Sequence, residues 1–329
     1  MFRKVSRLRN AVQLMFALLV VYVGLTFTLF VNAYLHGTTP VVSRPGGVEG
    51  FLPISALVAF KAWLATGQFD KIHPAGLIIF LTIVTISLLF KKAFCAWLCP
   101  IGTLSEGLAG LGRKFFGQNF KLPKALDYPL RAIKYLLLLF FVNIILLGMD
   151  GVMASGFLTS NYNLIADVKM LQFFEGLSGT ALLIVGLLVI ASVFIEHFWC
   201  RYLCPYGALL GIVGLLSPFK VTREEETCTG CGACTRACPN RIEVAKAKRV
   251  WSPECTSCLN CVNSCPAKGA LAYKPPLGKL LLSPKYTAAA IIATWLIFVI
   301  AAKATGHWDT AVTGNVYRQL IPLASQIGH

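Results

Sequence analysis

Charged side chains are scarce in this sequence. Only 13% of its 329 residues are Asp, Glu, Lys or Arg, whereas 56% are hydrophobic. A soluble domain of this length has no way to cover so much apolar surface. The composition therefore excludes an ordinary soluble globular protein and favours a chain embedded in a lipid bilayer.

Acidic residues are especially few, with 14 Asp and Glu against 30 Lys and Arg, which gives a net charge of +16. Such an excess is typical of a nucleic-acid-binding protein when the basic residues form one face of a folded domain. Here they lie mainly beside apolar runs. Membrane topology explains this placement better, so we expect no nucleic-acid partner.

The sequence lacks a Cys-x-x-Cys-His motif and has no isolated cysteine. The first absence excludes the usual covalent attachment of haem. All twelve cysteines belong to tight clusters whose spacings are those of metal ligands, and metal ligation needs reduced thiolates rather than disulfides.

Five apolar runs predict transmembrane helices, each of which needs roughly 20 residues to cross a bilayer. The predicted helices cover residues 11–34, 74–94, 133–149, 180–198 and 286–303. The first run is too long for a signal peptide and is not followed by a small-residue cleavage site, so we expect it to be retained. No charged residue lies in the middle of a run, which disfavours a substrate transporter. The apolar stretch 51–65 is too short to span and predicts either an interfacial helix or a packed loop.

The distribution of basic residues predicts the orientation of the chain. With the N-terminus inside, the inner segments 1–10, 91–134 and 196–285 contain 24 Lys and Arg, and the outer segments 36–74, 151–178 and 303–329 contain 6. The positive-inside rule therefore places the N-terminus in the cytoplasm and the C-terminus outside a bacterial-type inner membrane.

A polar, cysteine-rich insert at residues 222–275 carries the strongest motif. Cys-x2-Cys-x2-Cys-x3-Cys-Pro occurs twice, and in this pattern the fourth Cys ligates the cluster of the other motif. We therefore expect two [4Fe–4S] clusters, one held by Cys228, Cys231, Cys234 and Cys265 and the other by Cys255, Cys258, Cys261 and Cys238. Zinc knuckles or disulfides are the alternatives, but they rarely use two such three-plus-one runs.

An internal repeat carries the remaining four cysteines. Residues 94–104 match residues 199–209, and each copy contains Cys-x3-Cys-Pro at the end of a predicted helix. The repeat therefore predicts that the first two helices and the next two are parallel copies of one unit, with both motifs at the same membrane depth. If the motifs are helical, Cys95 and Cys99 share one face, and so do Cys200 and Cys204. Together they predict a third metal–sulfur site, with redox-active dithiols, a zinc site or buried apolar thiols as alternatives.

In these motifs the sequence resembles the NapH-type membrane ferredoxins, which are related to the C-terminal half of NosR and to MauN-type and CcoG/FixG-type proteins. The segments 95–100 and 200–205, followed by the paired ferredoxin motifs, carry the resemblance over about residues 11–304. It implies a quinol dehydrogenase subunit that passes electrons between the quinone pool and a partner redox protein of a respiratory complex. The FMN-attachment domain of the NosR kind has no counterpart here. The CcoG/FixG-like resemblance also permits an assembly factor that reduces a metal or thiol during biogenesis of another oxidoreductase.

A quinol site needs a proton acceptor close to water, and neutral histidine suits that role. The candidates near the predicted outer helix ends are His36, His73, His307 and Asp150. Two of the histidines could instead ligate a b-type haem, and the simplest alternative is that all four are interfacial or capping residues.

The sequence thus predicts an all-α polytopic membrane protein of about five transmembrane helices with an inserted ferredoxin-like domain. The predicted parts are a membrane domain at 1–221, the 2[4Fe–4S] domain at 222–275, and a C-terminal helix with an outer tail at 276–329.

Overall fold

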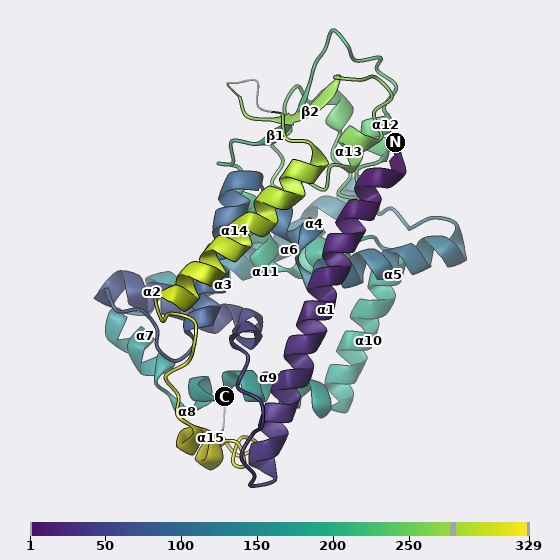
Figure 1. Ribbon diagram of the computed structural model, residues 1–329. Coiled ribbons are helices and arrows are strands. Elements are labelled where there is room, and N and C mark those ends of the chain that lie inside the picture. Colours follow the sequence, from purple (N-terminus) through teal and green to yellow (C-terminus); the bar gives the residue numbers. More distant parts are fainter. Residues whose placement is uncertain (1, 277–280, 328–329) are drawn as a thin grey trace. The chain divides into compact units, whose positions relative to one another are not determined.

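The computed structural model describes residues 2–276 and 281–327, which are mostly helical (Figure 1). The α-helices are α1 (Phe2–Leu35), α2 (Pro53–Thr66), α3 (Pro74–Phe90), α4 (Ala93–Trp97), α5 (Pro100–Phe116), α6 (Lys124–Phe141), α7 (Gly151–Leu158), α8 (Asn161–Leu164), α9 (Ala166–Glu175), α10 (Gly179–Phe194), α11 (Pro205–Val213), α12 (Ala233–Arg236), α13 (Asn260–Asn263), α14 (Pro284–Ala304) and α15 (Gly314–Leu320). The 3₁₀-helices are η1 (Gly46–Phe51) and η4 (Val244–Lys246), the π-helices are η2 (Val142–Leu147) and η3 (Trp199–Leu203), and the strands are β1 (Lys220–Arg223) and β2 (Leu271–Lys274).

Three helices among the described residues are long and apolar enough to cross a membrane, namely Arg7–Leu35, Lys124–Leu147 and Pro284–Ala304. The helices α9 and α10 would together make a fourth span, but the chain bends by 81° between them. At 17 residues, α3 is shorter than the roughly 20 residues that a span needs. The chain is therefore a membrane protein with three or four candidate spans, and the count of five stays a prediction.

The candidate spans carry large apolar side chains on their surface, which is the arrangement that lipid favours and water opposes. The exposed residues include Leu14, Leu18, Leu25 and Leu29 on α1, Leu136 and Leu139 on α6, Leu182, Leu183 and Leu187 on α10, and Ile297 and Ile300 on α14.

The prediction that no charge lies in the middle of a span is wrong for α6. Lys134 lies within the candidate span Lys124–Leu147 and is completely buried. The span begins at Lys124 rather than at residue 133, so Lys134, which stood at the start of the predicted run, lies near the middle of the span. Its charge is paired with a carboxylate of the insert, Glu254.

The described chain divides into two compact units. Unit 1 comprises Met1–Ala17, Ile83–Leu138 and Val185–Trp295, and unit 2 comprises Leu18–Thr82, Leu139–Ile184 and Leu296–His329. All twelve cysteines fall in unit 1.

In unit 1, the two strands frame the insert as an antiparallel pair in which Val221 lies opposite Tyr273. Both side chains are almost fully buried, because the alternation of a strand turns one face toward the core. The Tyr273 ring packs against Phe219, which packs against Phe90 at the end of α3 (ring centroids 5.7 and 5.8 Å apart). The insert is thereby packed against the helical part of the same unit.

In unit 2, the stretch predicted as an interfacial helix or a loop forms α2, which begins with Pro53 and ends at Gly67 (φ 71°). The core of this unit contains Phe27, Phe30 and Tyr317, and the Phe30 and Tyr317 rings meet edge to face at 5.3 Å.

The two cysteine loops of the insert share one backbone conformation. Gly230 and Gly232 in the first loop adopt φ of 69°, and the equivalent Ser257 and Leu259 in the second loop adopt φ of 47° and 59°. Left-handed backbone is easy for glycine and costs other residues roughly 1–2 kcal/mol. The loop therefore requires this conformation at both positions, whichever residue occupies them.

We expect Ser257→Gly to stabilise the chain by about 0.5–1 kcal/mol, because the relief of the left-handed strain exceeds the extra backbone entropy of glycine. Thermal unfolding of the detergent-solubilised protein measures the change. Ser264→Gly is the matched control, since Ser264 has an ordinary φ of −89° and should lose stability on substitution. A lower melting temperature in Ser257→Gly would show that the loop stores no such strain.

Candidate metal centre

The second cysteine set of the insert is gathered in one place. The Cys261 thiol interacts electrostatically with Cys258, Cys255 and Cys238, although Cys238 belongs to the first motif. Burial, followed by repulsion from Cys258, raises the pKa of Cys238 to about 12. The structure thus brings Cys238 to the set for which the sequence predicted it, and ligation of a cluster by these four thiols remains a prediction.

The first set lies nearer the solvent. Cys231 is exposed, Cys228 is partly exposed and Cys234 is buried. The backbone amide of Gly230 lowers the pKa of Cys228, and the amide of Ala233 lowers the pKa of Cys231. The Cys265 thiol donates to the carbonyl oxygen of Ala267 at 3.5 Å, and its ligation of this set also remains a prediction.

All twelve cysteines are free thiols, so the structure gives no support to the disulfide alternative. Among the described residues, no three His, Cys, Asp or Glu side chains are placed to hold a single metal ion.

The two Cys-x3-Cys-Pro motifs are not continuous helices. Cys95 lies in the short α4 and Cys200 in η3, whereas Cys99 and Cys204 are the N-cap residues of α5 and α11 and have extended backbone (ψ 121° and 104°). A residue before proline is driven out of the helical region, so the proline of each motif ends one helix and begins the next. The condition under which the paired thiols would share one helix face is therefore not met.

The break still gathers the four thiols. The Cys95 sulfur interacts with Cys99, Cys204 and Cys200, and burial followed by repulsion from Cys99 raises the pKa of Cys200 to about 12. The repeat therefore brings all four cysteines of its two copies to one site.

The surroundings of this site fit an anionic metal–sulfur group. Each second cysteine lies at a helix N-terminus, where free amides and the helix dipole favour negative charge. The Gly207 amide donates to the Cys204 sulfur at 3.2 Å, and the amides of Gly102 and Ile101 hydrogen-bond to Cys99. A side chain at Gly102 would collide with the Cys95 carbonyl, so this turn requires glycine. The four thiols and the surrounding amides are the donors that an iron–sulfur cluster requires.

Helical residues of unit 1 hold the second cysteine loop of the insert through one main-chain and one side-chain contact. The Trp97 indole donates to the Ser257 carbonyl at 3.1 Å, and Arg9 donates to the Asn260 side chain at 2.9 Å. Both Trp97 and Arg9 are buried. The second cysteine loop is therefore fixed against the helices that carry the Cys-x3-Cys-Pro motifs.

A buried ion pair gives a further connection. The Lys134 ammonium contacts both carboxylate oxygens of Glu254 at 2.7 and 2.6 Å, and the Tyr135 hydroxyl donates to the same carboxylate at 3.0 Å. Glu254 directly precedes Cys255, so a charge on α6 positions the start of the second cysteine loop.

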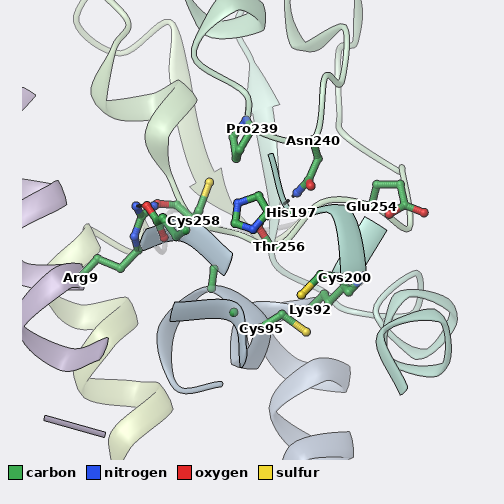
Figure 2. A pocket seen from close by; sticks show the side chains of 13 residues that line it. Arg9, Lys92, Cys95, His197, Cys200, Pro239, Asn240, Glu254, Thr256 and Cys258 are labelled. Atoms are coloured by element: carbon green, nitrogen blue, oxygen red, sulfur yellow. Dashed lines mark hydrogen bonds and ion pairs between the residues drawn. The ribbon is translucent and has the colours of Figure 1, made fainter. Parts of the chain in front are cut away.

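One cavity of unit 1 joins the two kinds of cysteine site. Cys95 and Cys200 of the repeat and Cys258 of the insert line it together. Figure 2 shows Lys92, Cys95 and Cys200 gathered at one end, with His197 beside the insert residues Thr256 and Cys258. His197 has left-handed backbone (φ 58°), which L-residues rarely adopt.

The four quinone-site candidates have different surroundings. His36 and His307 are exposed, and Asp150 accepts a hydrogen bond from the Met153 amide at 2.7 Å as the N-cap of α7. His73 is buried, and its Nε2 lies 2.6 Å from the Asn163 carbonyl oxygen. Capping, the simplest alternative, therefore accounts for the position of Asp150.

His73 belongs to a buried group of charges in unit 2. Arg44 pairs with Glu49 at 2.6 Å and with Asp167 at 2.7 Å, and Nδ1 of His73 lies 3.5 Å from Glu49. Burial by itself lowers the pKa of His73, but the hydrogen bond and the charge of Glu49 outweigh it, so the pKa lies above its usual value. His73 is thus the candidate placed among groups that exchange and stabilise protons.

Sequence reasoning missed the buried charges around the cysteine sites, including Lys92, Lys134 and Glu254. Their signal was present, because Lys92 precedes Cys95 by three residues and Lys134 begins an apolar run. An ionisable residue within or beside a membrane span is a functional candidate by default.

Comparisons with known proteins agree with these features. The model of a 4Fe–4S binding domain matches twice, at residues 72–119 and 177–224, and that of a 4Fe–4S dicluster domain matches residues 220–266. YccM of Escherichia coli (strain K12), for which a role in electron transport is proposed, is 44% identical over 334 residues, which cover 100% of this chain and 93% of YccM. The methylamine utilization ferredoxin-type protein MauN of Methylobacillus flagellatus is 31% identical over 57% of this chain and 64% of its own length. The ferredoxin-type protein NapH of Escherichia coli (strain K12) is 30% identical over 45% of this chain and 48% of its own length. No solved structure shows a significant match.

Proposed function

The chain belongs to the NapH-type membrane ferredoxin family, and we propose on this basis that it relays electrons between the quinone pool and a partner redox protein of a respiratory complex. Iron–sulfur electron transfer is the role common to the named relatives and the matching domains. We further propose that quinol is the electron donor and that the partner is a separate ferredoxin-type or cytochrome subunit.

The cavity shared by Cys95, Cys200 and Cys258 is the observation that carries this proposal. It supports continuity between the cysteines of the insert and those of the membrane helices within one compact unit. A soluble ferredoxin has no need of such a connection, whereas a protein that exchanges electrons with a lipid-soluble carrier does.

The bound clusters would supply one-electron redox chemistry. The residues that would hold them are the two sets in the insert and, for a third cluster, Cys95, Cys99, Cys200 and Cys204. The helix N-termini at Cys99 and Cys204 stabilise negative charge at this third site. The buried contacts of Trp97 and Arg9 keep the second cysteine loop in position.

The exposed loop that contains Cys228 and Cys231 is the part of the insert best suited to meet a partner protein. The distribution of basic residues supports a cytoplasmic N-terminus and insert, with the C-terminus outside. Of the proposed quinone-site residues, His73 is the one buried among titratable groups, beside Glu49 and Asp167.

Iron and acid-labile sulfide per chain, measured on anaerobically purified protein together with EPR of the reduced state, test the third site. Two cubane clusters account for about eight irons, and three for about twelve. We expect more than eight, and a fall toward eight in the Cys95→Ser/Cys99→Ser variant, in which both ferredoxin sets stay intact.

A count of about eight that the double variant leaves unchanged would contradict the third cluster. It would make the four thiols a dithiol or zinc site and favour the assembly factor that reduces a metal or thiol. Stoichiometric co-purification with a terminal reductase would distinguish a respiratory subunit from such a factor, which binds its target transiently.

A further inference from the structure

Lys92 lies among the four cysteines of the repeat. Its side chain is 4% exposed, and its strongest electrostatic attraction is to Cys95, followed by Glu254, Cys204 and Cys200. A Cβ at Gly207 would lie 3.3 Å from the Lys92 ammonium and 3.5 Å from the Cys204 sulfur, so both atoms pack against the same glycine. The ammonium group is thus part of the thiol site.

The neighbouring lysines have other roles. The Lys91 ammonium donates to the carbonyl oxygens of Val250 and Ser252 at 2.9 and 3.0 Å, which ties α3 to the insert. Lys134 is neutralised by Glu254. Glu254 attracts the Lys92 ammonium as well, and Lys134 acts on Cys200 less strongly than Lys92 does. Lys92 is therefore the lysine with the strongest electrostatic attraction to the thiols.

The repeat places a basic residue at the same point in both copies. Lys92 precedes Cys95 by three residues, and His197 precedes Cys200 by three residues. Both line the cavity between the repeat cysteines and Cys258 (Figure 2). The position therefore faces the redox site in each copy, and the first copy supplies an ammonium there.

Four thiolates around a cubane core carry a net charge of about −2 when oxidised and about −3 when reduced. Burying such a charge is costly unless a cation lies beside it. Since reduction adds negative charge, a fixed positive charge stabilises the reduced form more than the oxidised form and raises the reduction potential.

We propose that Lys92 is the charge-compensating residue of the third iron–sulfur cluster and that its ammonium raises the reduction potential of that cluster. This inference rests on the third cluster of the proposed function. It adds that the charge of one side chain, rather than burial in general, sets the reduction potential of the cluster at the four repeat cysteines.

Potentiometric EPR titration of the purified full-length chain tests it, with the iron content determined on the same samples. We expect Lys92→Met to lower the midpoint potential of the signal that is lost in Cys95→Ser/Cys99→Ser and to leave the other signals in place. Lys92→Arg keeps the charge and should preserve the potential. Lys246→Met is the matched control, because Lys246 is 81% exposed and should change none of the signals.

An unchanged potential in Lys92→Met with full iron content would overturn the inference. Loss of the cluster in both Lys92→Met and Lys92→Arg would also overturn it, because the site would then require the size and shape of the lysine side chain rather than its charge. Loss in Lys92→Met with retention in Lys92→Arg would support it. If the unaltered chain contains only about eight irons, the third cluster of the proposed function has failed, which is a different result from an unshifted potential.

Discussion

Replacing Cys258 with serine will abolish the reduction of a partner protein by a quinol analogue. Cys258 lies with Cys255, Cys261 and Cys238, and it lines the cavity shared with the repeat cysteines. Loss of this ligand should remove about four irons per chain and interrupt electron transfer on both sides of the site. The measurement is quinol-dependent reduction in membrane vesicles, alongside the iron content. We expect the same loss of activity for Cys231→Ser in the first set.

Thr256→Ser is the control for this experiment. Thr256 lines the same cavity but contributes no sulfur, so its substitution should leave the activity and the iron content unchanged. Normal electron flow in Cys258→Ser or Cys231→Ser would show that the ferredoxin sets lie outside the functional pathway, and the relay would then be wrong.

Lys134→Met should cost about 3–5 kcal/mol of stability, because it leaves the Glu254 carboxylate buried without its partner. The ammonium is fully buried and Glu254 is 9% exposed, so solvent screens the pair only weakly. Thermal unfolding in detergent measures the loss, and the EPR spectrum of the second set reports whether the start of its loop has moved.

The double variant Lys134→Met/Glu254→Met isolates the cause. It removes both charges, so it should recover a large part of the stability lost by Lys134→Met. Lys124→Met is the surface control, since Lys124 pairs with Glu243 but is 76% exposed, and it should have little effect. A double variant less stable than Lys134→Met would show that packing of the lysine stem, rather than the unpaired carboxylate, dominates.

The grouping of the second insert set could be predicted from the ferredoxin-type spacing, whereas the grouping of Cys265 with the first set stays a prediction. Three cysteines at intervals of three residues form one local loop, and the fourth, followed by proline, points away from it. The structure places Cys238 with Cys255, Cys258 and Cys261 in agreement with that expectation. The short chain between Cys255 and Cys261 accounts for three members of the set, and the two-cluster pattern accounts for the fourth, Cys238.

The conformation of the repeat motifs was predicted less well, although its cause is also local. Pro100 and Pro205 impose extended backbone on the cysteines before them, so the helical case on which a shared face depended does not hold. The consequence is functional, since the second cysteine of each motif becomes a helix N-cap rather than a residue on a helix face.

The buried charges could not be predicted from local patterns. Lys134 and Glu254 are 120 residues apart in the sequence. Successive cysteines of one motif, in contrast, lie within a few residues of each other. The pairing follows from how α6 packs against the insert, which is a tertiary property.

The contrast in exposure between the two insert loops has a practical consequence for handling the protein in air. Dioxygen and alkylating reagents reach a thiol or cluster sulfur only where solvent does, and Cys231 is exposed whereas Cys261 is buried. Damage should therefore begin at the first loop and proceed inward, so a partly degraded preparation would retain its innermost iron longest. In a cell, the same order would make the loop that contains Cys228 and Cys231 the first part of the chain to be damaged under oxidative stress.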